Sequence, residues 1–246
     1  MVSMPSVVSA KEWQRERDAL LVAEKEATRH LDGIAAQRRR LPMVRLDNEK
    51  YLFETTDGPK RLLDFFDGRP QLAIYQFMDN GPDAFCPGCT HMTDNVSDLA
   101  TLADEGVSWR TVSNMPLAQM ESYWVSKRWT VPFASSRETS FADDCGASRG
   151  FMLNLFFTDG EQVYRTYATS GRGVDRLLFV NNILDLAPYG RQEDWENSPP
   201  AGPSTRPTAE VRRKVLSRQP QGYAPLFLCA CSLAPGSGPV LARHGR

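Results

Sequence analysis

The strongest constraint on the fold is a buried strand that leads through a short loop to two cysteines at the start of a helix. Residues 72–78 form an almost continuous apolar run, which is typical of a strand buried on both faces. The motif Cys86-Pro87-Gly88-Cys89 then opens a helical stretch over residues 90–105. The sequence therefore predicts a pair of thiols at the amino end of a helix, beside a sheet.

The segments after this helix alternate between strand and helix. We expect a strand at 107–112, a helix at 116–129, strands at 151–157 and 162–167 joined by a turn at 158–160, and a helix at 174–184. The order strand, helix, strand, helix, hairpin, helix predicts an α/β protein with a thioredoxin-like fold, in which helices flank a mixed central sheet.

The two ends of the chain differ from this central part in composition and in sequence pattern. Residues 10–40 read as one helix capped by Ser9, and its apolar face predicts packing along the domain or a partner subunit, which leaves a homodimer open. A short hairpin is expected at 51–58. Proline and glycine crowd the chain after residue 197, so we expect disorder there. The predicted units are a helical extension (1–43), a thioredoxin-like domain (44–197) and a basic tail (198–246).

The distribution of charge argues against nucleic acid as a partner. The first 200 residues hold 22 basic and 29 acidic residues, a net charge of −7, whereas residues 201–246 have a net charge of +6. Phosphate binding needs a clustered basic face, which the acidic body lacks. We see neither an apolar stretch of the ~18–20 residues that a membrane span requires nor a secretory leader, so we expect a cytoplasmic protein that binds no membrane.

Cys86 and Cys89 are the candidate catalytic residues. Unpaired N–H groups and the dipole at a helix start favour negative charge, so we expect the pKa of Cys86 to lie below the ~8.5 of a free cysteine. Cys86 would act as the nucleophile, and Cys89, one turn further on, would resolve the mixed disulfide that it forms. Pro87 and Gly88 shape the turn without covering the sulfurs. We expect no cofactor.

His91 has two interpretations: when protonated it would add positive charge near the thiolate, or it is an ordinary exposed residue of the first turn. The cysteine pair has two alternatives to redox chemistry. In one, both cysteines are inert buried thiols. In the other they bind zinc, which needs two more ligands, although no second pair with zinc-ribbon spacing is present. The remaining zinc candidates are Cys145, Cys229, Cys231, His30, His91 and His244. Cys145 follows two aspartates that would raise its pKa, and we interpret it as structural.

Several segments together resemble the thioredoxin-like family catalogued as domain of unknown function 899, over roughly residues 8–197. They are the Trp13 helix with Glu24-Lys25-Glu26, Leu41-Pro42, Tyr51-Leu52-Phe53, the segment from Phe77 through the cysteine motif, Tyr164-Arg165-Thr166-Tyr167, Gly171-Arg172-Gly173 and the stretch from Leu184 to Arg191. Members are described as predicted dithiol-disulfide oxidoreductases, so the resemblance implies that activity. Arg172 and Arg191 have no obvious chemical role, and we expect them to bind a carboxylate or a helix C-terminus.

A weaker likeness is to peroxiredoxins. Ser148-Arg149-Gly150-Phe151 before a strand is similar to the entry of the strand that carries an arginine in that group, and this implies that Arg149 approaches Cys86, unless it is a surface residue. The Pro-x-x-x-Thr-x-x-Cys signature of peroxiredoxins is absent, which counts against direct peroxidase activity. Two features also depart from thioredoxins: Phe85 replaces the tryptophan before the motif, and residues 146–155 contain no proline.

These observations predict a thiol–disulfide oxidoreductase that acts on a protein or a small-molecule disulfide or thiol. A thiol peroxidase and a non-catalytic thioredoxin-fold binding protein are the alternatives.

Overall fold

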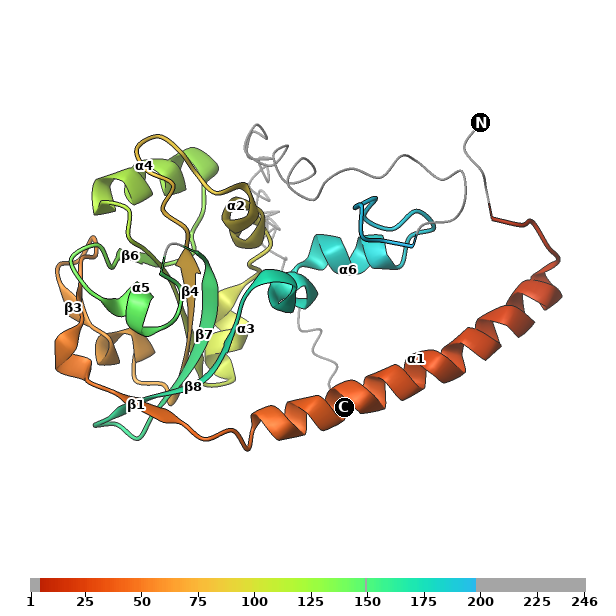
Figure 1. Cartoon of the computed structure of the whole chain (residues 1–246), viewed down its shortest axis with the longest axis horizontal. Coiled ribbons are helices and arrows are strands. Elements are labelled where there is room, and N and C mark those ends of the chain that lie inside the picture. The colour runs from red at the N-terminus through yellow and green to blue at the C-terminus, as the bar shows by residue number, and fades with distance from the viewer. Residues whose placement is uncertain (1–4, 149, 198–246) are drawn as a thin grey trace, which may run out of the picture.

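The structure is a computed structural model that describes residues 5–148 and 150–197. A six-stranded mixed sheet forms the body, and a long N-terminal helix, α1 (Ala10–Arg38), runs away from it (Figure 1). In spatial order the sheet consists of β1 (Val44–Leu46), β8 (Val163–Thr169), β7 (Met152–Thr158), β4 (Gln71–Phe77), β5 (Val107–Ser113) and β6 (Phe133–Ser135). A second, two-stranded sheet pairs β2 (Leu52–Phe53) with β3 (Lys60–Arg61), as the predicted hairpin requires.

The central strand β4 is parallel to β5 on one side and antiparallel to β7 on the other. β7 continues into the antiparallel partner β8, so that the order β8–β7–β4–β5 places the predicted hairpin of β7 and β8 beside the central strand β4. This order and these directions are those of the thioredoxin-like fold, and the predicted fold is confirmed. β1 and β6 extend the sheet at its two edges.

Strand β4 is buried on both faces, as its apolar run predicts. Because successive side chains of a strand alternate between faces, Leu72 and Ile74 join one hydrophobic cluster and Ala73, Tyr75 and Phe77 join another. The first cluster lies against short helical elements that include η2 (Leu63–Phe66) and α5 (Phe141–Asp144). The second contains Cys86 and Cys89, so the dithiol is part of the core on one face of the sheet.

The helices differ from prediction in two places. They are α2 (Pro87–Asp94), α3 (Leu99–Asp104), α4 (Leu117–Lys127), η3 (Gly171–Leu177) and α6 (Phe179–Asp185), besides those named above and the short turn η1 (Asn48–Lys50). The single helix expected at 90–105 is wrong: Asn95 closes α2, and the Asp98 side chain accepts the Ala100 N–H at 2.9 Å to begin α3. The helix expected at 174–184 is likewise divided, into η3 and α6.

Helix α1 forms where predicted, and the Ser9 hydroxyl accepts the Glu12 N–H at 3.2 Å. None of its residues is buried, and Trp13 is 58% exposed, so α1 does not pack along the domain as one of the two expectations had it. Packing against a partner subunit, and with it a homodimer, stays a prediction. No helix in the described part of the chain has the length and apolar character needed to cross a bilayer. The predicted tail, 198–246, lies outside the described residues.

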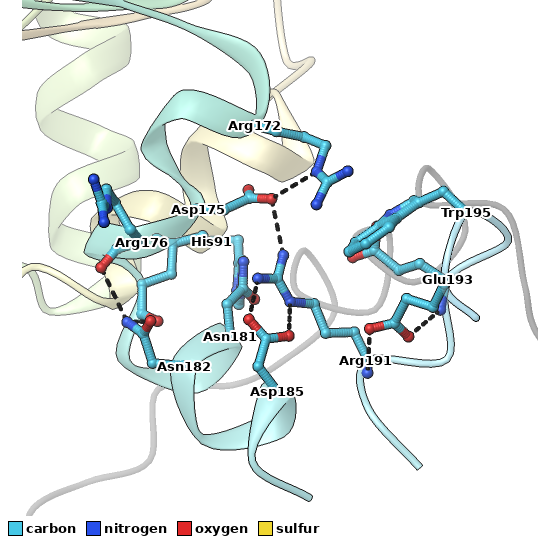
Figure 2. Close-up of polar contacts among 12 residues, drawn as sticks. His91, Arg172, Asp175, Arg176, Asn181, Asn182, Asp185, Arg191, Glu193 and Trp195 are labelled. Carbon is cyan, nitrogen blue, oxygen red and sulfur yellow. Dashed lines mark hydrogen bonds and ion pairs between the residues drawn. The ribbon is translucent and has the colours of Figure 1, made fainter. Parts of the chain in front are cut away.

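The last described segment is fixed to the body by Arg191. Its guanidinium lies between two carboxylates: Nη1 is 2.8 Å from Asp175 Oδ2, and Nε donates to Asp185 Oδ1 at 2.7 Å (Figure 2). The side chains of Arg191 and Asp175 are only 7% and 9% exposed, and Asp185 is the last residue of α6. The expectation that Arg191 binds a carboxylate or a helix C-terminus is confirmed for the first alternative, since its partners are the carboxylates of Asp175 and Asp185.

We predict that Arg191→Met lowers the free energy of unfolding by about 3 kcal/mol, because it leaves the buried Asp175 carboxylate without its main partner. Arg176→Met is the matched control, since Arg176 is an exposed arginine that directly follows Asp175 in η3, and it should change stability by less than about 0.5 kcal/mol. Urea unfolding under reducing conditions measures both. Equal effects of the two substitutions would show that the ion pairs do not hold the segment.

Candidate active site

Cys86 is the N-cap of α2, and its sulfur accepts a backbone N–H of the first turn. The Cys89 N–H donates to Cys86 Sγ at 3.3 Å, and Pro87, which has no N–H to satisfy, begins the helix. The carbonyl of Cys86 accepts both the N–H and the hydroxyl of Thr90, each at 2.9 Å. The motif therefore opens a helix as predicted, with one sulfur in the position where a helix start stabilises an anion.

Cys89 lies beneath Cys86 and has the opposite electrostatic setting. Its pKa is raised well above the usual value, first by burial and then by its hydrogen bond to Cys86 and the charge on that sulfur. Two donors oppose this shift: the Tyr75 hydroxyl and the Met78 N–H, whose nitrogen is 3.4 Å from Cys89 Sγ. Since the Cys89 thiol is held protonated, it serves as a hydrogen-bond donor to the neighbouring sulfur.

The two sulfurs also differ in their access to solvent. Cys86 is 7% exposed, whereas Cys89 is completely buried. Both are free thiols in this structure. Both residues thus belong to the core, and Cys86 is the one that keeps some exposed surface.

An aromatic stack joins the loop before the cysteine motif to helix α4. The ring of Phe85 stacks on Tyr123 with centroids 3.5 Å apart and an angle of 2° between the planes. The Tyr123 hydroxyl is 2.8 Å from Thr90 Oγ1, and burial raises the pKa of Tyr123 to about 12. Phe85 thus keeps the aromatic role of the residue before the motif, by stacking rather than through an indole donor.

A hollow of about 320 Å³ lies beside this stack, between the loop that precedes the motif and the exposed side of α4. Pro82, Asp83 and Phe85 line it from the loop, and Gln119, Ser122, Tyr123 and Ser126 line it from the helix. Gln119 Nε2 also donates to the Gly81 carbonyl at 3.0 Å, which fixes the loop to α4. The hollow is lined by both polar side chains and the aromatic pair Phe85 and Tyr123.

Two other predicted site residues lie elsewhere or are not described. His91 Nε2 is 3.4 Å from Asn181 Oδ1, so the ring is directed toward α6 on the far part of the helix (Figure 2). Its effect on the thiolate stays a prediction. Arg149 lies outside the described residues. Within the described ranges, 5–148 and 150–197, no peptide bond is cis. In the same ranges no group of three or more His, Cys, Asp or Glu side chains could hold a metal ion. The zinc candidates Cys229, Cys231 and His244 lie beyond that range.

Sequence reasoning missed Tyr75, Thr90 and Tyr123. Tyr75 looked like one more apolar residue of the central strand, and its alternation within 72–78 is the only signal that places it on the same face as Phe77. Thr90 and Tyr123 are 33 residues apart, and nothing in the sequence pairs them.

Cys145 is a third free thiol, and it lies in the other hydrophobic cluster, away from the dithiol. Burial raises its pKa to about 11, Asp144 adds to the shift, and Arg165 opposes it. The prediction of a raised pKa is confirmed, although burial contributes more than the acidic neighbours that motivated it. A thiol held neutral and out of solvent is a structural residue rather than a nucleophile.

Cys145 should make stability depend on pH in a defined window. Because its folded pKa of about 11 exceeds the ~8.5 of an unfolded cysteine, unfolding releases a proton between these values, and stability falls as the pH rises through them. Relative to Cys145→Ala, the wild type should lose up to about 1.4 kcal/mol per pH unit in this window, and the difference should level off above it. Urea unfolding in a reducing buffer measures both curves, and parallel curves would contradict the burial of a neutral thiol.

Fold and motif together define a thioredoxin-fold protein with a Cys-x-x-Cys pair at a helix start. The model of a family described as "Bacterial protein of unknown function (DUF899)" matches residues 2–214, and the chain belongs to this family. A search of curated proteins finds no match.

Solved structures with similar folds include redox proteins of low sequence identity. The peroxidoxin BcpB from Mycobacterium tuberculosis is 18% identical, over 52% of this chain and 88% of that chain, with a TM-score of 0.40. A PrxQ mutant from Xylella fastidiosa is 15% identical, over 55% and 91%, with a TM-score of 0.38. A secreted Mycobacterium tuberculosis disulfide oxidoreductase homologous to E. coli DsbE is 11% identical, over 52% and 91%, with a TM-score of 0.35.

Proposed function

We propose that this protein is a thiol–disulfide oxidoreductase in which Cys86 attacks and Cys89 resolves. The observation that supports this most is the asymmetry of the pair: the sulfur of Cys86 accepts hydrogen bonds at a helix start in a residue that is 7% exposed, while Cys89 is completely buried and its thiol is held protonated. If both thiols were inert, nothing would require this difference in burial and protonation between them. The substrate class is a protein or small-molecule disulfide, and a cytoplasmic setting would keep the pair reduced between cycles.

The first step is attack of the Cys86 thiolate on one sulfur of the substrate disulfide. A bond forms between Cys86 Sγ and that sulfur, the substrate's S–S bond breaks, and the second substrate sulfur leaves as a thiolate that takes a proton from water. The N–H of Cys89 and the dipole of α2 stabilise the attacking anion. The hollow that Phe85 lines, one residue before Cys86 in the chain, is the surface on which we place the substrate.

The second step follows from what the first removes. Once Cys86 is in a mixed disulfide it carries no charge, so two of the causes that raise the pKa of Cys89 are lost. The Tyr75 hydroxyl and the Met78 N–H remain as donors and favour the Cys89 thiolate. Cys89 then attacks Cys86 Sγ, releases the substrate as its second thiol and leaves a Cys86–Cys89 disulfide, which an external dithiol reductant must reduce.

The two alternatives predict different behaviour of the same residues. In a thiol peroxidase, Cys86 would attack hydrogen peroxide to give a sulfenic acid and water, and Cys89 would condense with it to release a second water. In a binding protein, neither cysteine would affect function. A burst of fluorescence change within milliseconds of mixing the reduced protein with peroxide would favour the peroxidase over the disulfide reductase.

Trapping of mixed disulfides tests the proposal. We predict that Cys89→Ser, reduced and then mixed with a disulfide-bonded protein such as oxidised insulin, accumulates a covalent complex at Cys86 that a reductant releases, because the resolving sulfur is missing. Cys86→Ser should form none, and it should abolish insulin reduction by the dithiol-regenerated protein. Non-reducing electrophoresis and peptide mass mapping measure the complex.

Cys145→Ser in the Cys89→Ser background is the matched control, since it removes another buried free thiol without touching the pair. It should leave the trapped complex unchanged. Trapping that survives Cys86→Ser, or that is lost only with Cys145, would contradict the assigned roles.

A further inference from the structure

A second hollow, remote in sequence from the dithiol, lies where the end of α1 meets β8, η3 and α6. Its volume is about 420 Å³, within the range of small-molecule sites. Four arginines line it: Arg38 from α1, Arg172 and Arg176 from η3, and Arg191 from the last described segment. Only two acidic side chains, Asp175 and Asp185, line it with them. The lining groups therefore carry a net charge of +2.

The two carboxylates are already committed to one of these arginines. Asp175 and Asp185 hold the buried Arg191 from two sides, and Arg172 adds only a longer contact, 3.6 Å from Asp175 Oδ2 (Figure 2). The two carboxylates position Arg191, and the negative charge that Arg191 does not balance faces Arg172 through Asp175. Arg172 is also held in place by the ring of Trp195, whose centroid is 3.5 Å from its Cζ.

Arg38 and Arg176 complete the surface with positive charge that the described residues do not neutralise. Arg38 lies over the Tyr167 ring, with Cζ 5.3 Å from the centroid, and no carboxylate is within ion-pair distance of either guanidinium in the described residues. Two guanidiniums that line one hollow without carboxylate partners make it electrostatically favourable for an anion.

We infer that this hollow is a binding site for a small phosphate-bearing anion, held by Arg38, Arg172 and Arg176. The guanidinium fork matches the oxygens of phosphate in two-fold hydrogen bonds, and three forks around one hollow suit a group with several oxygens in different directions. Arg191 contributes charge from below while its own donors stay on the aspartates. The site is separate from the proposed dithiol chemistry and stands or falls independently of it.

Calorimetric titration of the full chain with inorganic pyrophosphate at about 0.15 M ionic strength tests this site, because salt at that level screens exposed charges beyond about 8 Å. We expect saturable binding of one pyrophosphate per chain. Arg176→Gln and Arg38→Gln should each weaken it by about tenfold, the loss expected for one charge-assisted contact. Arg176 is exposed and Arg38 is half-buried against Tyr167, so circular dichroism and urea unfolding check that both variants are folded.

Arg29→Gln is the matched control, since it removes one exposed charge from the same helix as Arg38 at a position that does not line the hollow. It should leave the affinity unchanged. Absence of saturable binding, equal weakening by Arg29→Gln, or malonate that binds as tightly as pyrophosphate would each overturn the proposal.

Discussion

The hydrogen bonds that converge on the sulfur of Cys86 are the interaction around which the candidate active site is arranged. They require the Cys89 N–H and thiol to be aimed at one atom, and this follows from the position of Cys86 as N-cap with Pro87 behind it. Moving Cys86 into the helix would turn its sulfur away from those donors. The same contact helps to raise the pKa of Cys89, since the charge on the Cys86 sulfur keeps the proton on the Cys89 sulfur.

The sheet determines how deeply this pair is buried. β4 places Tyr75 and Phe77 on the face that receives α2, and the backbone immediately after the strand gives Cys89 its Met78 donor. On the outer side, the stack of Phe85 on Tyr123 joins the motif's loop to α4. The dithiol is therefore enclosed by elements that are far apart in the chain, and only Cys86 keeps a narrow exposure to solvent.

The sequence was sufficient for the fold and for the pair of cysteines because both depend on local patterns. An apolar run of seven residues, a Cys-x-x-Cys motif and a hairpin turn each specify their element over a short range. The division of the helix after residue 94 was missed because Asn95 closes α2 through tertiary contacts: its Oδ1 accepts the N–H of Val180 at 3.1 Å. Tyr75, the partners of Tyr123 and the arginine-lined hollow depend on segments that meet only after folding, so no local pattern indicates them.

The pKa values of the two sulfurs test the central claim most directly. Reduced protein with 13C-labelled cysteine β-carbons can be titrated by NMR, with Cys86→Ser and Cys89→Ser used to assign the signals. The account predicts that Cys86 ionises below the ~8.5 of a free cysteine and that Cys89 remains protonated well above it. Cys86 protonated above that value, or Cys89 ionising first, would contradict it.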